Sequence, residues 1–514
     1  MSNPPSLAEL TENLVPFSAQ QVASSLIWCA LDVNDKKELH NACSYLIDPA
    51  STAPAKIFLA ERYGGSGIQR NGGGARCGFD GHYQVKGIGA NPLVGKGSDQ
   101  RHTNGALAAI HAIYEVLWSE VLAEALPYGA VRTRAVLLTD HYIPFECNKS
   151  LSRRALLIRD PVVRPAHFER APYFRPNPEY VGQLTHDAQR IRSVIHKLPA
   201  NLPTPQTGFS EQAYLDPQLY CIEGLCELAS RQAWQMAFCR TRFLRLTTSP
   251  SNIAIDGRLM DFNGLSCLFP GNYRDDFGYR LRLTELMKEP AVLQQGLSDL
   301  CLYLGKYLFT PEFTLIARQQ VKDSYQKNFQ QACYFSYLEL LGIPTNILSL
   351  KEVPETLKKL VNSFTKLLDS RSGTFYCPQN DDKSGSPLQK LVVALIRGSH
   401  GKMVFHFGDL KNDAHFTEAL TCFTEAICSL VKNDQTQGND VTVILKKMEQ
   451  HAQQRMQPRD CLNKTRMSQE ITGLLDTHGD DIPSLRQAFS EIETRIKNFA
   501  REALGRLKPG RYVP

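Results

Sequence analysis

The most informative part of this 514-residue chain is the stretch Ser251-Asn252-Ile-Ala-Ile-Asp256-Gly257-Arg-Leu-Met-Asp261-Phe262. Asp256-Gly257 lies at its centre and is typical of a tight turn between two short strands. Such a hairpin would bring Asn252 and Asp261, near its two ends, close together. Their amide and carboxylate oxygens are ligands that a hard divalent cation prefers. The stretch therefore predicts a magnesium site, and an ordinary β-hairpin is the alternative interpretation.

A glycine-rich segment lies upstream, between short β-type pieces at 56–59 and 82–86. It contains the run Arg70-Asn-Gly72-Gly73-Gly74-Ala-Arg76. Glycines let backbone N–H groups approach phosphate oxygens closely, and a nearby arginine adds positive charge. This pattern predicts a phosphate-binding turn built from Gly72, Gly73, Gly74 and Arg76. A flexible hairpin without a chemical role is the alternative interpretation.

A strand lysine, a helix carboxylate and two arginines follow in order. Lys86 ends the β-type piece at 82–86, and Glu115 lies on an amphipathic helix expected over 105–126. In kinase-type folds such a lysine is oriented at the ATP phosphates by such a glutamate. Arg159 and Arg164 lie just past a predicted strand, and guanidinium groups match phosphate geometry. Unrelated surface charges are the alternative for Lys86 and Glu115, and a solvated turn with structural arginines is the alternative for Arg159 and Arg164. Their order along the chain favours one shared site.

The periodicity of apolar residues gives the expected organisation. We predict a helix over 17–47, with Val22, Leu26, Ala30 and Leu31 on one face, and strands at 130–139 and 154–158. From about residue 180 the pattern is helical, at 181–198, 211–242, 281–306, 310–342, 355–370, 387–397, 414–432 and 438–507. A linker is expected at 378–387.

Three domains are predicted from this organisation. The first, 1–175, is a mixed α/β unit with the glycine-rich loop, the strand lysine and the helix glutamate. The second, 176–385, is mostly helical and contains the hairpin at 250–263. The third, 386–514, is a helical C-terminal module. A mixed half followed by a helical half favours a ligand site between them.

Composition excludes several classes of protein. A net charge of +6 and a charged fraction of 21% are far from the basic density of a nucleic-acid binder. The 14 cysteines are scattered without a Cys-x-x-Cys, which predicts reduced, buried thiols and no zinc ribbon. We see no signal peptide and no apolar run near the roughly 20 residues that span a bilayer. A cytoplasmic protein without a membrane span or a nucleic-acid partner is therefore expected.

The ordered motifs resemble the selenoprotein O pseudokinase family over residues 60–265. The resemblance is carried by Tyr63-Gly-Gly-Ser-Gly67, Gly72-Gly-Gly-Ala-Arg76, Gln84-Val-Lys-Gly-Ile-Gly89, Tyr114-Glu-Val-Leu-Trp-Ser-Glu120, Pro127-Tyr-Gly-Ala-Val-Arg-Thr-Arg-Ala135 and Arg164-Pro-Ala-His-Phe-Glu169. It implies a protein-kinase-like, bilobal α+β fold: a mixed α/β N-lobe, a mostly helical C-lobe and a helical C-terminal extension. It also implies ATP and Mg²⁺ as cofactors. The implied catalytic residues are Lys86, Glu115, Arg159 and Arg164; the implied ATP-binding residues are Gly72, Gly73, Gly74, Arg76, Lys86, Arg159 and Arg164; the implied metal ligands are Asn252 and Asp261.

This chain departs from that family at the catalytic base. The family transfers AMP to protein hydroxyls, and its His-Gly-x-x-Asn-Thr-Asp-Asn loop supplies an aspartate. The corresponding loop here is Arg245-Leu-Thr-Thr-Ser-Pro-Ser-Asn252, so Ser251 stands at the position of the aspartate. A peptide α-carboxyl, with an unperturbed pKa of about 3.5, is anionic at neutral pH without any base. A hydroxyl needs a base, which is worth roughly 10²–10⁴ in rate. The pattern therefore favours a carboxylate acceptor.

Over most of its length the chain is similar to the MchC/MceJ-type maturation proteins of bacterial siderophore-microcin gene clusters. That resemblance implies a small acyltransferase-like partner in a heteromeric complex. It implies attachment of glucosylated enterobactin, a catechol siderophore, to the C-terminal carboxylate of a microcin precursor peptide, with an acyl-adenylate or acyl-phosphate formed from ATP. Two other interpretations stay open: an inactive pseudokinase scaffold for the acyltransferase, and a protein AMP-transferase with another base, such as Asp256. The helices after residue 388 are the expected docking surface for the partner.

Overall fold

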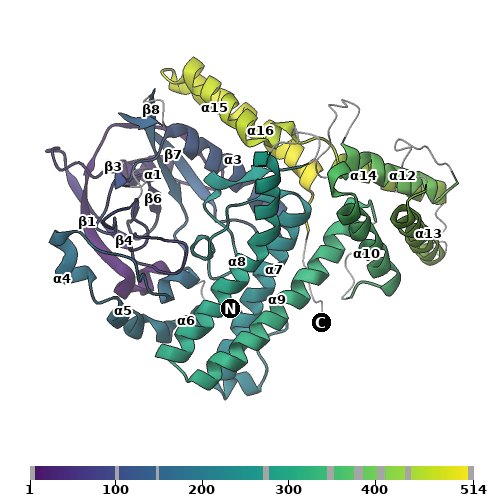
Figure 1. The fold of residues 1–514 in the computed structure, drawn as a ribbon. Coiled ribbons are helices and arrows are strands. Elements are labelled where there is room, and N and C mark those ends of the chain that lie inside the picture. Colours follow the sequence, from purple (N-terminus) through teal and green to yellow (C-terminus); the bar gives the residue numbers. More distant parts are fainter. Residues whose placement is uncertain are drawn as a thin grey trace.

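The computed structural model describes residues 6–98, 103–145, 150–269, 277–343, 352–375, 386–401, 410, 412–434 and 441–507. They form a mixed α+β protein in which an antiparallel eight-stranded sheet is followed by a mostly helical C-terminal region (Figure 1). The linker expected at 378–387 lies, except for its last two residues, outside the described residues.

The sheet has the strand order β2-β7-β8-β6-β5-β4-β1-β3, and its pairings are antiparallel. The strands are β1 Leu14–Gln21, β2 Ser24–Cys29, β3 Tyr45–Leu46, β4 Ala55–Glu61, β5 Cys77–Phe79, β6 Gln84–Lys86, β7 Thr133–Phe145 and β8 Ser150–Arg159. Lys86 pairs with Leu157 on one side and with Cys77 on the other. The predicted site lysine therefore lies in the middle of the sheet, held by a strand on each side.

The helix predicted over 17–47 is wrong. The chain instead forms β1, β2, the short helix α1 (Lys36–Cys43) and β3. In β1, Val15, Phe17 and Ala19 are buried, whereas the residues between them are exposed. This period of two is typical of a strand with one buried face. The helical interpretation followed the spacing of a few apolar residues, but one of them, Leu31, is 98% exposed.

The helix expected over 105–126 is confirmed as α3 (Ala109–Ala125), which packs against β7 and β8. The helical character of the chain beyond residue 180 is also confirmed. The remaining helices are α4 Val181–Leu184, α5 Asp187–Val194, α6 Leu198–Asn201, α7 Pro217–Thr241, α8 Phe277–Tyr307, α9 Pro311–Leu340, α10 Glu355–Ser370, α11 Ser372–Phe375, α12 Pro387–Gly398, α13 Ala414–Asp434, α14 Val441–Arg455, α15 Lys464–His478 and α16 Ile482–Leu504.

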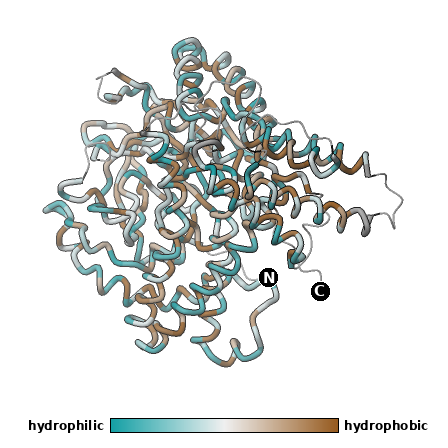
Figure 2. Tube along the Cα trace, turned by 45° about the vertical axis from the view of Figure 1, so that its right-hand side comes forward, coloured by the Kyte–Doolittle hydropathy of each residue, from teal (hydrophilic) through white to brown (hydrophobic). Residues whose placement is uncertain are grey.

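Local sequence explains where the two longest capped helices begin. The side chains of Asp216 and Thr310 cap α7 and α9, and a proline follows each cap at the first helical position. A capping oxygen satisfies an unpaired N–H group, and proline fits the first turn because it needs no hydrogen bond there. Outer helices alternate between hydrophilic and hydrophobic residues in Figure 2, as helices with one buried face do.

The last two helices return to the N-terminal half of the chain. Both α15 and α16 pack against α3, and α16 also packs against β2 (Figure 1). One buried hydrophobic cluster contains both Leu10 and Leu507. The domain boundaries at 175 and 385 stay predictions, but the C-terminal helices share a core with the residues of the N-terminal half.

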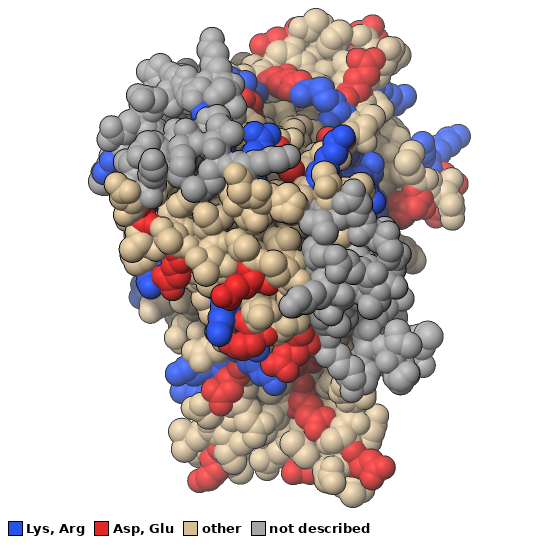
Figure 3. Space-filling view, turned by 90° about the vertical axis from the view of Figure 1, so that its right-hand side faces the viewer, with Lys and Arg blue, Asp and Glu red and all other residues tan. Residues whose placement is uncertain are grey.

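Two general properties agree with the composition. None of the described helices is long and apolar enough to cross a membrane. On the face shown in Figure 3, the described acidic and basic side chains are interspersed among uncharged ones. This mixture is expected from 58 basic and 52 acidic residues.

Candidate functional site

The structure brings Lys86, Glu115 and Asp261 together at the end of β6. The Lys86 ammonium lies 2.6 Å from Glu115 Oε2 on α3 and also pairs with the carboxylate of Asp261. Lys86 is 1% exposed and Glu115 is 2% exposed. The sequence predicts the contact with Glu115 but not the second contact with Asp261. A single ammonium thus joins the sheet, α3 and the stretch that follows α7.

Arg159 lies beside this cluster, and Arg164, which lies 3.9 Å from the Glu61 carboxylate, is buried as well. Arg159 Nη1 lies 3.4 Å from Glu115 Oε1 and 3.8 Å from Asp261 Oδ1. Arg164 Nη1 donates to the carbonyl of Ser251 at 3.0 Å, so it contacts the backbone just before Asn252. Both arginines are at most 3% exposed, so they do not lie in a solvated turn, and a structural role for them stays open as the alternative.

The stretch at 251–262 forms the expected tight turn, but its two arms are not the short strands of a regular β-hairpin. They meet at an isolated bridge between Ile253 and Leu259, and the turn contains Gly257 with a φ of 91°. Met260 N donates to Asn252 O at 3.1 Å, which places Asn252 beside the end that carries Asp261. The flanking strands β9 (Leu244–Arg245) and β10 (Ser266–Cys267) pair with each other and close the base of this loop. The fold therefore presents the two predicted metal ligands on neighbouring backbone positions.

Asp261 is the part of the cluster most open to solvent, with its side chain 25% exposed. Burial by itself would raise the pKa of Asp261, but the charges of Lys86, Arg159 and Arg76 outweigh burial and hold this pKa well below its usual range. The carboxylate is therefore ionised over the physiological pH range. Its φ of 69° is left-handed, which is unusual for a residue other than glycine and is frequent at functional positions.

Asn252 and Asp261 fit a magnesium ion as a pair of oxygen ligands. Asp261 is ionised and partly open, and Asn252 is half-buried. Mg²⁺ usually takes one or two protein carboxylates or amides and completes its shell with water and substrate phosphates. Within the described ranges, no group of three or more His, Cys, Asp or Glu side chains could hold a metal. A magnesium ion at this pair would therefore need oxygens from a nucleotide or from water.

Two of the glycines at 72–74 pack closely against other parts of the chain. A Cβ on Gly73 would clash with the carbonyl of Glu61, and one on Gly72 would lie 2.7 Å from the Phe174 ring. Both glycines are thus needed for packing against the chain itself, and a role for Gly72, Gly73 and Gly74 at a phosphate stays a prediction. The glycine that lies against the start of the 251–262 stretch is Gly67, because a Cβ on Gly67 would clash with the hydroxyl of Ser249.

Several neighbours of the cluster were missed by sequence reasoning. Gln84 contacts both Glu61 and Arg159, Glu61 Oε2 lies 3.5 Å from His167 Nε2, and Asn263 Nδ2 donates to Glu115 Oε2 at 2.5 Å. The period of two along β6 places Gln84 on the same face as Lys86, so this residue could have been found. Glu61 and Asn263 carry no such local signal. On the other side of its ring, His167 Nδ1 accepts a hydrogen bond from the backbone N–H of Arg164 at 2.9 Å.

Glu169, next to this cluster in sequence, gives a prediction for stability. Burial raises the pKa of Glu169 from 4.5 to about 8, with a smaller contribution from Asp299. The folded state therefore holds a proton that the unfolded state loses, so stability falls as the pH rises from 4.5 to about 8. Glu169→Gln should remove a slope of up to about 1.4 kcal/mol per pH unit. Urea unfolding at several pH values in that window measures it, and an unchanged slope in the variant would contradict the assignment.

Comparison with known proteins adds no assignment. No family model matches this chain, and no curated protein matches it significantly. The class of protein is therefore defined by fold and site alone: a mixed α+β chain with a buried lysine held between two carboxylates and flanked by arginines.

Proposed function

We propose that this chain is the ATP- and Mg²⁺-dependent subunit of a peptide-modifying complex. It activates the C-terminal carboxylate of a microcin precursor for ester linkage to a glucosylated catechol siderophore of the enterobactin type. A small acyltransferase-like protein is its partner, and the bacterial cytoplasm is its compartment. The supporting observation is the buried contact of Lys86 with both Glu115 and Asp261. Kinase-type nucleotide sites use this combination of groups, and we infer a protein-kinase-like, selenoprotein O-like bilobal fold.

The proposed roles follow from charge and position. Lys86, Arg76, Arg159 and Arg164 would face the phosphates of ATP, and Glu115 would orient Lys86. Asp261 and Asn252 would hold magnesium, which supplies positive charge to the phosphates when bound. Because Asp261 now pairs with Lys86 and Arg159, nucleotide binding would replace these contacts with contacts to phosphate.

A carboxylate is the expected acceptor because Ser251 stands where the selenoprotein O family has its aspartate base. The Asp256 carboxylate is engaged by Arg258 at 2.8 Å in the turn at the far end of the hairpin. A carboxylate oxygen can form a bond to the α-phosphorus without losing a proton, and pyrophosphate leaves with the broken P–O bond. A sugar hydroxyl then attacks the acyl carbon, AMP leaves, and the hydroxyl proton passes to solvent. Adenylate formation is chosen over acyl-phosphate by analogy with the family.

One observation favours a second candidate function, an inactive scaffold for the acyltransferase partner. Lys86 and Arg159 are already paired with carboxylates, and Gly67 lies against Ser249 and Ser251. A bound nucleotide would have to break these contacts, and the cost of breaking them would weaken its binding. A pseudokinase scaffold would keep the contacts permanently. The same contacts are expected in a nucleotide-free enzyme whose glycine-rich segment moves when ATP binds.

One assay separates the candidates. The chain and its partner are mixed with Mg²⁺, ATP labelled at the α-phosphate, a glucosylated catechol siderophore, and a peptide that ends either in a free carboxylate or in an amide. The proposal predicts release of labelled AMP only with the carboxylate peptide. Label that becomes attached to protein with either peptide would indicate an AMP-transferase acting on hydroxyls, and neither release nor attachment of label would indicate the scaffold.

A further inference from the structure

The C-terminal helix α15 reaches the candidate site through a single asparagine. Lys464, the first residue of α15, donates from Nζ to the carbonyl of Asn263 at 2.7 Å. The side-chain amide of Asn263 donates to Glu115 Oε2 at 2.5 Å, and Glu115 pairs with Lys86 at 2.6 Å. The Lys464 ammonium also lies 5.7 Å from the ring of Tyr114, the neighbour of Glu115. Three successive contacts thus connect the C-terminal region with Lys86.

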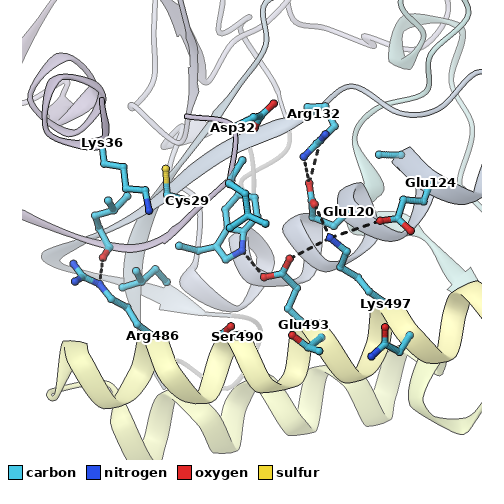
Figure 4. Close-up of a pocket in the computed structure, with 18 of the residues that line it drawn as sticks. Cys29, Asp32, Lys36, Glu120, Glu124, Arg132, Arg486, Ser490, Glu493 and Lys497 are labelled. Carbon is cyan, nitrogen blue, oxygen red and sulfur yellow. Dashed lines mark hydrogen bonds and ion pairs between the residues drawn. The ribbon is translucent and has the colours of Figure 1, made fainter. Parts of the chain in front are cut away.

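The other C-terminal helix, α16, holds α3 from a different side. It bounds a cavity of about 690 Å³ together with α3 and β2 (Figure 4). Lys497 Nζ lies 3.1 Å from Glu120 Oε2, and Arg501 Nη2 lies 3.0 Å from Glu124 Oε2. The Glu120 side chain is only 7% exposed and is also held by Arg132 at 3.0 Å. The Lys497–Glu120 pair is therefore partly buried, whereas the Arg501–Glu124 pair, with side chains 61% and 47% exposed, is solvated.

The two sets of contacts act on different faces of one helix. With 3.6 residues per turn, Glu120 lies about 140° around α3 from Glu115, whereas Glu124 lies close to the face of Glu120. A contact on one face leaves a helix able to roll about that contact. Contacts on two faces fix its rotation, and the rotation of α3 decides whether Glu115 meets Lys86.

We propose that α15 and α16 brace α3, and that Asn263 and Lys464 are positioning residues that hold Glu115 against Lys86. Lys464 and Asn263 are 201 residues apart in the sequence, so this part of the site comes from a region expected to serve partner docking. The brace itself is a property of the fold. Its effect on ATP rests on the proposed function.

Two variants and one matched control test the brace. Lys464→Met and Lys497→Met each remove one arm, and Arg495→Met is the control, because Arg495 lies on α16 but pairs with Glu470 of α15. Amide hydrogen exchange of residues 109–125 should become about fivefold faster or more in both test variants, as loss of one charge-assisted contact gives. The control should leave this exchange at the wild-type rate. Unchanged exchange in both test variants, or an equal increase in the control, would overturn the proposal.

A second readout separates positioning from general stability. ATP affinity should fall about tenfold in Lys464→Met, while its midpoint of thermal unfolding stays near that of the Arg495→Met control. Lys464→Arg keeps the charge and should restore affinity. An affinity loss that only follows the unfolding midpoint would overturn the positioning role. If the wild-type chain binds no ATP, the proposed function fails, and hydrogen exchange alone still decides whether the brace exists.

Discussion

Lys86→Met is expected to lower the free energy of unfolding by about 3–5 kcal/mol and to remove ATP-dependent activity. Methionine nearly keeps the volume of lysine, but it leaves Glu115 and Asp261 without their shared ammonium. The Glu115 side chain is 3% exposed, so water cannot replace the lost partner. Removing one member of a buried ion pair is costly because the other charge stays buried. Urea unfolding followed by circular dichroism measures the change in stability.

The control for Lys86 is a lysine whose ion pair is solvated. Lys366 on α10 pairs with Glu418 on α13 at 3.1 Å, and the two side chains are 55% and 47% exposed. Lys366→Met should therefore cost at most about 1 kcal/mol, as measured for solvated pairs. A Lys86→Met variant that is no less stable than Lys366→Met would mean that the cluster around Lys86 is open to water.

The parts of the site that sequence reasoning found are those defined by local pattern and order. Lys86 lies on a short strand and Glu115 on the helix that follows, and a contact between them can be expected once both elements are recognised. The hairpin could be predicted because Asp256-Gly257 is a turn signal in itself. Local turn chemistry and helical periodicity are properties of a few neighbouring residues, so one sequence suffices to detect them.

The missed parts depend on contacts between distant segments. The stretch at 14–46 has apolar residues that fit both a helix and a strand, and pairing with β4 and β7 decides in favour of strands. Asn263 and Lys464 meet only because α15 returns to the N-terminal half. The glycines at 72–74 show that one local composition fits two structures. It suits a phosphate-binding turn, and it equally suits close packing such as that of Gly73 against Glu61.

The second large effect is expected at Asp261. Asp261→Asn keeps the size of the side chain but removes the charge that we assign to magnesium, while Glu115 still pairs with Lys86 and Arg159. Loss of a charged contact worth about 3 kcal/mol corresponds to at least about 100-fold weaker binding of ATP in Mg²⁺. Asp256→Asn is the matched control on the same hairpin, because the Asp256 carboxylate pairs with Arg258. Its affinity should stay within about twofold of the wild type.

Calorimetric titration of ATP into the folded chain, with Mg²⁺ or with EDTA, tests this account most directly. The account predicts saturable binding that requires Mg²⁺, survives Asp256→Asn and is lost in Asp261→Asn. Wild-type protein that takes up no ATP in Mg²⁺, or an Asp261→Asn variant that binds it as tightly as the wild type, would contradict the claim that this buried cluster is a magnesium–nucleotide site.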